Sequence, residues 1–259
     1  MKVLFIGDIV GRPGRAALAA TLPELRERHA PDLVIANGEN AAGGLGITER
    51  NAKEIYAMGV DVITLGNHSF RHRDVYDYLD REQRIIRPAN YMTGNPGRGS
   101  TVVEAAGRRV GVINLSGTVQ LRAARSPFPE VEMLLDRMDH EVDVFIVDFH
   151  AEVTSEKVAM GWHLDGRVAA VLGTHTHVPT ADARVLPKGT AFISDVGMTG
   201  SRDGVLGVRW EQALEGFRTQ MPIKFSTAED NVWINGAVVT VGDDGLAESI
   251  EQVLVPAES

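Results

Sequence analysis

Short apolar runs alternate with amphipathic stretches along the first half of the chain. The runs are rich in Val, Ile and Leu and have the length of buried strands, while the stretches between them repeat their apolar positions with helical spacing. This pattern predicts strands at residues 2–6, 33–36 and 62–65, alternating with helices at residues 14–29, 48–58 and 73–81. Such alternation is typical of βαβ units, which place parallel strands side by side in one sheet.

Turn residues between apolar runs predict hairpins in the rest of the chain. The runs at residues 101–104 and 109–115 flank the turn Ala106-Gly107, and two later pairs of runs flank turns rich in Gly and Asp or Pro. The further predicted elements are helices at 129–138 and 154–160, strands at 142–147 and 168–172, and hairpin strands at 183–186, 191–195, 231–241 and 246–255. We therefore expect a mixed α/β fold, with βαβ units first and antiparallel strands later, layered as two sheets between helices.

Composition and length add a single-domain expectation to this picture. The 259 residues are 44% hydrophobic and 24% charged, which is ordinary for a globular protein, and no composition break marks a linker. One domain over residues 1–259 is therefore expected. The first apolar run is far shorter than a signal-peptide core or the roughly 20 residues of a membrane span, so we expect a cytoplasmic protein without a membrane partner.

Charge and cysteine content limit the chemistry. The chain has no cysteine, which excludes disulfides, thiolate metal sites and cysteine nucleophiles, so any metal must be bound by nitrogen and oxygen. The formal net charge of -9 argues against a strong nucleic-acid surface, which needs clustered Lys and Arg. A small anionic substrate stays compatible, because two divalent ions would add about four positive charges in one cleft.

Metal-ligand residue types follow five of the predicted strands. Taken alone, each has an ordinary structural explanation: an Asp can cap a helix, a His can be a hydrogen-bonded core residue, and an Asn can close a turn. Together they indicate one polynuclear metal site, because ligands of open α/β sheets gather outside the carboxyl ends of strands. The residues are Asp8, Glu39 and Asn40, Asn67 and His68, His150, and His175 and His177.

The order of these blocks resembles the calcineurin-like metallophosphoesterases, whose motifs run GD-x-H, GD, GNH-[DE], a lone His and GH-x-H. The chain departs from them in having Val10 where the family has a His, Glu39-Asn40 where it has a bridging Asp, and Ser69 after Asn67-His68. These departures, with the opening Gly-Asp-Ile-Val-Gly-Arg-Pro-Gly at residues 7–14, resemble the bacterial branch of 2′,3′-cyclic-nucleotide phosphodiesterases. The resemblance extends from the first strand to about residue 200.

The resemblance implies a fold, a cofactor and a set of roles. The fold is a four-layer α/β/β/α sandwich of two mixed sheets flanked by helices, and the cofactor is a pair of divalent or mixed-valence metal ions, iron or manganese, with zinc as a further candidate. A metal-bridging hydroxide would attack the phosphorus of a small phosphodiester such as a cyclic nucleotide, and His68 would act as general acid. The implied ligands are Asp8, Glu39, Asn40 and His177 for the first ion, and Glu39, Asn67, His150 and His175 for the second.

Other functions stay open from the sequence. A nuclease or a phosphomonoesterase could use the same dimetal site, and a regulatory binding module could retain the metals with incidental hydrolysis. Residues 195–200 are expected to form either backbone on the substrate side of the site or an ordinary turn. The late hairpins could provide an edge for a homo-oligomer. No substrate-binding residue can be named from the sequence.

Overall fold

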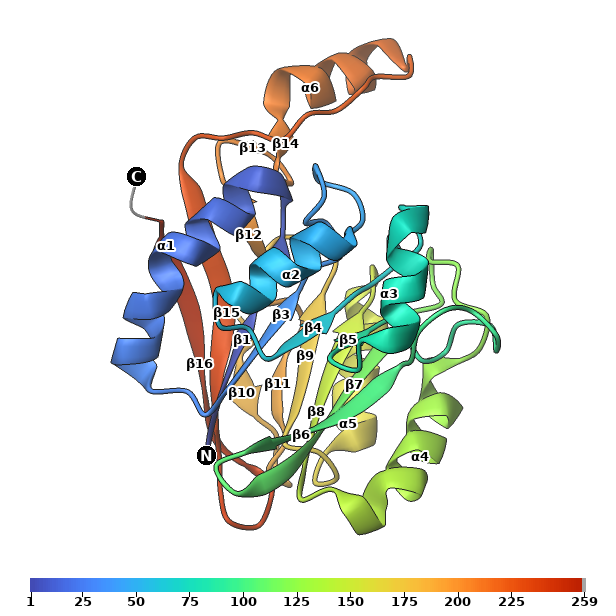
Figure 1. The fold of residues 1–259 in the computed structure, drawn as a ribbon, viewed down its shortest axis with the longest axis vertical. Coiled ribbons are helices and arrows are strands. Elements are labelled where there is room, and N and C mark those ends of the chain that lie inside the picture. The colour runs from blue at the N-terminus through green and yellow to red at the C-terminus, as the bar shows by residue number, and fades with distance from the viewer. Residues whose placement is uncertain (258–259) are drawn as a thin grey trace.

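Two mixed sheets pack face to face, and helices cover the outer face of each (Figure 1). The protein is represented by a computed structural model that describes residues 1–257. Three groups of buried apolar residues separate the layers, one between the sheets and one under the helices on each side. The expected four-layer α/β/β/α architecture is therefore confirmed.

The first sheet has eight strands in the order β2-β12-β15-β1-β3-β4-β5, with β16 paired to β15. Strands β1, β3, β4 and β5 are parallel, whereas β15 runs antiparallel to β1 and lies between β1 and the edge strand β16. The strands are β1 (Lys2–Ile6), β2 (Asp8–Ile9), β3 (Leu33–Asn37), β4 (Val62–Thr64), β5 (Ile85–Ile86), β12 (Met198–Ser201), β15 (Val232–Val241) and β16 (Ala247–Pro256).

The second sheet has six strands in the order β10-β11-β9-β8-β7-β6. Its four inner strands are parallel, and the two edge strands are added antiparallel by hairpins. The strands are β6 (Ser100–Ala105), β7 (Arg108–Ser116), β8 (Val144–His150), β9 (Ala170–Thr174), β10 (Arg184–Val185) and β11 (Ala191–Ile193).

Of the six α-helices within the described residues, five lie on the two sheets and the sixth stands apart. The first sheet carries α1 (Gly11–His29), α2 (Glu49–Ala57) and the pair η1 (Arg73–Val75) and α3 (Tyr76–Arg81), and the second carries α4 (Pro127–Met138), η2 (Asp139–Glu141) and α5 (Thr154–Leu164). Helix α6 (Trp210–Thr219) projects from the body beside the short hairpin of β13 (Gly204–Val205) and β14 (Val208–Arg209) (Figure 1). Among residues 1–257, no helix has the length and apolar character needed to cross a membrane.

Alternation along the strands explains why the layers form. In β1, Val3 and Phe5 point into the core between the sheets, whereas Leu4 and Ile6 point to the core under the helices. All four side chains are fully buried, so both faces of the strand are apolar. A strand of this kind is stable only between two layers, which is the position that the continuous apolar run of the sequence predicts.

The structure corrects the sequence predictions in two places. Helix α1 begins at Gly11 and not at residue 14, and its N-cap is Val10, so Asp8 does not serve as the cap. The segment 195–200 is neither a substrate-side loop nor an ordinary turn throughout, because Met198–Ser201 is strand β12. This strand is short and rich in small residues, and its conformation depends on pairing with β2 and β15.

Candidate metal centre

Eight side chains from both sheets meet where the parallel strands end. Asp8 comes from β2, the turns after β3 and β4 supply the next four residues, and the remaining three follow β8 and β9. Contacts of 3.8 Å or less connect every member to at least one other. We call the following set the cluster: Asp8, Glu39, Asn40, Asn67, His68, His150, His175 and His177.

The Nε2 atom of His150 lies at the centre of one half of the cluster. It is 3.1 Å from Glu39 Oε1, 2.9 Å from Asn67 Oδ1 and 3.1 Å from His175 Nδ1. A single proton on Nε2 could be shared well with only one of these three atoms. A cation among them would satisfy all four, since each can offer a lone pair.

Three of the four cluster histidines have an outward ring nitrogen held by an acceptor. His150 Nδ1 lies 2.9 Å from Thr174 Oγ1, whose own proton goes to Asp148 Oδ1 at 2.7 Å, so the hydroxyl accepts from the ring. The His175 Nε2 atom lies 2.9 Å from Glu152 Oε2. Metal-binding histidines usually have such outer partners, which fix the tautomer and leave the other nitrogen free for the metal.

His177 follows the same rule in the other half of the cluster. Its Nδ1 donates to the carbonyl oxygen of Leu206 at 3.0 Å, which leaves Nε2 facing Asp8 Oδ1 at 3.8 Å. Asp8 is fully buried, and within residues 1–257 its Oδ1 has no hydrogen-bond partner. A buried carboxylate oxygen without a donor is costly unless a cation neutralises it, so this half also fits a metal.

Asn40 lies between the two halves of the cluster. Its amide nitrogen, and not its oxygen, faces Glu39 and His177. Its Oδ1 accepts from His68 Nδ1 at 2.8 Å, while its Nδ2 lies 3.1 Å from His177 Nε2 and 3.2 Å from Glu39 Oε1. To bind a metal ion between Glu39 and His177, the Asn40 carboxamide would have to make a half turn that exchanges the positions of its oxygen and nitrogen. The pair Asn40 and His68 would then exchange donor and acceptor roles.

The charges of the cluster are strongly coupled. Burial opposes ionisation of Glu39, but His150 and His68 outweigh burial and hold the pKa of Glu39 well below its usual range. Burial alone would lower the pKa of His150, yet the charges of Glu39 and Asp8 raise it to about 9. Burial and the neighbouring His150 lower the pKa of His175 to about 3, so this ring is neutral and able to act as a ligand.

Backbone strain and close packing also mark the site. His175 and His177 have φ values of 102° and 66°, a left-handed conformation that is unfavourable for residues other than Gly. At Gly66, an added Cβ would lie 2.2 Å from His150 Nε2 and 2.4 Å from Glu39 Oε2. Only glycine fits there, because the backbone itself forms one wall of the cluster.

A buried ion pair holds the strained loop. Lys157 donates to Asp195 Oδ2 at 2.7 Å and to the carbonyl oxygen of Thr174 at 2.8 Å. The Thr176 amide and hydroxyl donate to the same carboxylate oxygen at 3.0 and 2.7 Å. Sequence reasoning missed this pair and the outer partners Asp148, Glu152 and Thr174, because they carry no motif spacing.

The position where the family motif has a histidine is filled by packing. Val10 is 2% exposed, and a Cβ on Gly207 would come within 2.8 Å of its side chain. No imidazole is therefore available at this position, and Asn40 is the polar group that lies closest to the side of His177 facing the cluster.

Comparisons with known proteins agree with the motifs. Residues 4–253 match a protein-family model described as YmdB-like protein. The chain is also 44% identical over 256 residues to the 2′,3′-cyclic-nucleotide 2′-phosphodiesterase of Bacillus subtilis (strain 168), covering 98% of this chain and 97% of that protein. These matches confirm the resemblance that the spaced motifs indicate.

Two solved structures share the whole fold. A hypothetical protein from Thermus thermophilus is similar with a TM-score of 0.94 and 40% identity, and each chain is covered completely. A structure described as a novel phosphatase from Mycoplasma pneumoniae has a TM-score of 0.92 and 33% identity, over 100% of this chain and 94% of that one.

Proposed function

The chain belongs to the YmdB-like protein family, and from that premise we propose that it is a phosphodiesterase that hydrolyses 2′,3′-cyclic nucleotides. The observation that carries the proposal is a convergence of possible metal donors. The ring nitrogens of three histidines meet the oxygens of Glu39 and Asn67 and an Asp8 oxygen that has no hydrogen-bond partner within residues 1–257. The full-length similarity to the Bacillus subtilis phosphodiesterase supports the substrate class.

The cluster would bind two metal ions that share Glu39. Its donors are nitrogen and oxygen only, which suits iron or manganese, with zinc as the next candidate. The first ligand set comprises Asp8, Glu39, Asn40 and His177, and the second comprises Glu39, Asn67, His150 and His175. When bound, such a pair supplies positive charge at the phosphate oxygens and an activated water near neutral pH.

His68 is the proposed general acid. Its Nδ1 lies 2.8 Å from Asn40 Oδ1 and 3.5 Å from Glu39 Oε1, so the ring orientation is fixed. The side chain is 29% exposed, so a leaving oxygen can approach the ring. The proton for the leaving alkoxide would therefore come from the ring Nε2, the nitrogen that faces away from Asn40.

The experiment that tests this function is hydrolysis of 2′,3′-cyclic AMP by metal-stripped protein, before and after addition of manganese. We expect manganese-dependent opening of the ring to a single monophosphate isomer, identified chromatographically. Uptake of two metals without turnover would contradict the proposed substrate class and would favour another phosphoester or a binding role.

Two variants separate metal binding from proton transfer. Glu39→Ala should lose metal and activity together, because it removes the carboxylate that both ligand sets share. His68→Ala should keep its metal content but lose about 10²–10⁴-fold in kcat, the usual contribution of a positioned acid. Metal content by elemental analysis and kcat on the same samples check this prediction. Full turnover in His68→Ala would overturn its role.

For the cell, we propose a cytoplasmic location and self-association of the chain. Strand β16 pairs with β15 on one side, and no strand within residues 1–257 pairs with its other side. An open strand edge is a ready template for pairing with a second copy. Cell fractionation tests the location, and sedimentation at micromolar protein concentration tests whether the mass is a multiple of 28.0 kDa.

A further inference from the structure

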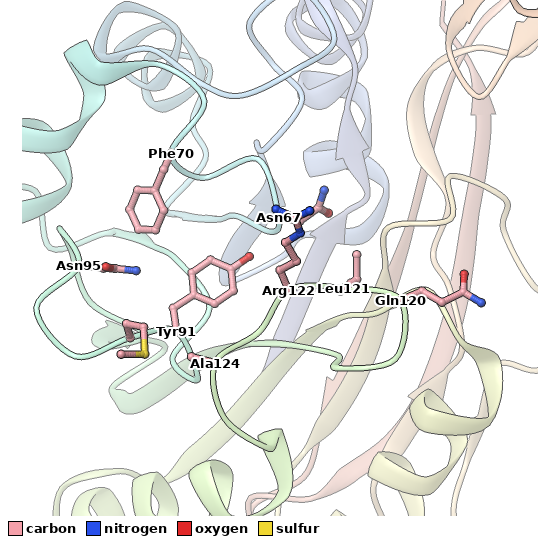
Figure 2. A pocket seen from close by; sticks show the side chains of 9 residues that line it. Asn67, Phe70, Tyr91, Asn95, Gln120, Leu121, Arg122 and Ala124 are labelled. Atoms are coloured by element: carbon pink, nitrogen blue, oxygen red, sulfur yellow. The ribbon is translucent and has the colours of Figure 1, made fainter. Parts of the chain in front are cut away.

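A cavity of about 440 Å³ opens beside the cluster and shares Asn67 with it (Figure 2). We call it the aromatic pocket. We propose that it binds the base of a nucleotide substrate, an inference that rests on the proposed function and adds the residues that would select nucleotides. These residues are Asn67, Phe70, Tyr91, Asn95 and Arg122.

Two aromatic rings form one end of the pocket. The ring centroids of Phe70 and Tyr91 are 6.0 Å apart, and the rings are inclined by 42°. This spacing leaves no room for a base between them as in a sandwich, so a base would stack on one ring face and touch the edge of the other. Base-aromatic stacking of this kind contributes about 1–3 kcal/mol and works for every base.

Both rings are held in place before any ligand binds. The Tyr91 hydroxyl donates to the carbonyl oxygen of Gly66 at 3.3 Å, and burial raises the pKa of this phenol to about 12, so it stays protonated. Phe70 packs edge-on against Tyr76, whose hydroxyl donates to the Phe70 carbonyl oxygen at 2.9 Å. A rigid stacking surface loses little entropy on binding.

Different polar groups lie at the two ends of the pocket. Within residues 1–257, the carboxamide of Asn95 makes no hydrogen bond and the guanidinium of Arg122 makes neither a hydrogen bond nor an ion pair. In Figure 2 Asn95 lies at the aromatic end, whereas the side chain of Arg122 extends toward Asn67. Asn67 in turn lies 2.9 Å from His150 Nε2.

A nucleotide matches this order of groups in one orientation. Its phosphate would lie at the end of Asn67 and Arg122, next to the cluster, and its base would reach Phe70 and Tyr91. The Asn95 carboxamide has both a donor and an acceptor, so it can pair with the edge of the base. The geometry thus assigns base recognition and phosphate attraction to opposite ends of one pocket.

The test compares 2′,3′-cyclic AMP with the cyclic phosphate of 1-O-methylribose, which has the same reacting ring but no base. Phe70→Leu should raise KM for 2′,3′-cyclic AMP by roughly tenfold, within the range of base stacking, and leave kcat/KM for the baseless diester unchanged. Phe70→Tyr should restore the KM. The matched control is Phe217→Leu on α6, where the ring is 81% exposed and lies outside the aromatic pocket.

Asn95→Ala gives an independent readout, because Asn95 takes no part in the contacts of Phe70 with Tyr76 and Tyr91. This variant should also raise KM only for the nucleotide, whereas Arg122→Gln should weaken both diesters by a similar factor. Equal effects of Phe70→Leu and Asn95→Ala on both diesters, or no effect on either, would overturn the base-binding role.

Binding of 3′-AMP by calorimetry separates this inference from the proposed function. If the unmodified protein hydrolyses neither diester, the proposed function fails and the pocket is judged by binding alone. We expect Phe70→Leu and Asn95→Ala to weaken 3′-AMP binding by roughly tenfold, with Phe217→Leu unchanged. Unchanged binding in both pocket variants would contradict the base site whatever the enzyme hydrolyses.

Discussion

Asp148, Thr174 and His150 form a chain of hydrogen bonds that decides which nitrogen of His150 faces the cluster. All three side chains are fully buried, so no solvent can replace a lost partner. The hydroxyl of Thr174 has one proton, and because Asp148 takes it, the ring proton of His150 must be on Nδ1. The orientation of one hydroxyl in β9 thus sets which ring nitrogen of His150 in β8 faces the cluster.

Replacing this hydroxyl should weaken metal binding without touching a ligand. Thr174→Val keeps the shape of the side chain but leaves His150 Nδ1 and Asp148 without their shared partner. We expect metal affinity to fall by about 10–100-fold, the usual cost of losing an outer partner of a histidine ligand. Competition with a chelator measures the affinity.

Thr174→Ser is the matched control for that change, because it retains the hydroxyl and should bind metal as tightly as the unmodified protein. Equal metal affinity in the Val and Ser variants would show that the hydrogen-bond chain does not position His150.

At the scale of elements, helix α5 and the loop after β9 are joined by the buried pair Lys157 and Asp195. Both side chains are about 2% exposed or less, and together they fix the backbone that carries His175 and His177. Gly173 contributes as well, because a Cβ there would lie 1.7 Å from the carbonyl oxygen of Ser194. The strained loop is therefore held by close packing of two strand ends and by a charge pair behind them.

Breaking this pair should cost much stability. Lys157→Met removes the cation and leaves the Asp195 carboxylate buried, which we expect to lower the free energy of unfolding by about 3–5 kcal/mol. Lys53→Met removes a cation from the surface pair with Glu49, where Lys53 is 64% exposed, and should change stability by less than about 1 kcal/mol. Chemical denaturation of the two variants side by side measures the difference. Similar midpoints would contradict a structural role for the buried pair.

The elements that the sequence predicted share a physical property. Strands such as β1 and β8 have long apolar runs, and the hairpins at Ala106 and at residues 242–245 have turn residues that adopt positive φ, so local pattern and tertiary structure agree. Strands β2, β12, β13 and β14 have two to four residues, which is too short for any periodicity to appear. Their extended conformation comes from pairing with distant segments.

For the candidate site as well, the sequence predicted one part, the cluster residues, and not the other, the residues that support them. The eight cluster residues follow strands and recur in motif order, so the sequence alone could group them. Their supports could not be found in this manner. Thr174 reaches Asp148 across 26 residues, and His177 reaches a backbone oxygen 29 residues away, and such contacts leave no mark in either local sequence.

At the scale of the molecule, the cluster joins the two sheets. Asp8, Glu39 and Asn67 follow strands of the first sheet, whereas His150 and His175 belong to the second. Ions bound among them would tie the sheets together at the ends of their strands, so metal binding and global stability should be linked.

Metal removal should therefore lower the melting temperature. A ligand at a hundredfold excess over its Kd adds about 2.7 kcal/mol, which corresponds to roughly 5–10 °C for a chain of this size. Thermal unfolding with and without a chelator measures the shift, and manganese should restore it. An unchanged melting temperature, with metal loss verified by elemental analysis, would contradict the link between the sheets.

The pairing of β15 with β1 joins the two ends of the chain and has a consequence for folding during synthesis. Strand β1 is translated first, but β15, which pairs with it over residues 2–6, begins only at Val232. All cluster residues leave the ribosome earlier, and at ~5–20 residues per second several seconds pass before the sheet can close. During this interval β1 can pair with β3, but its other edge, along the apolar run 3–6, has no strand partner. We therefore expect the nascent chain to expose an aggregation-prone strand edge until its last hairpin is complete.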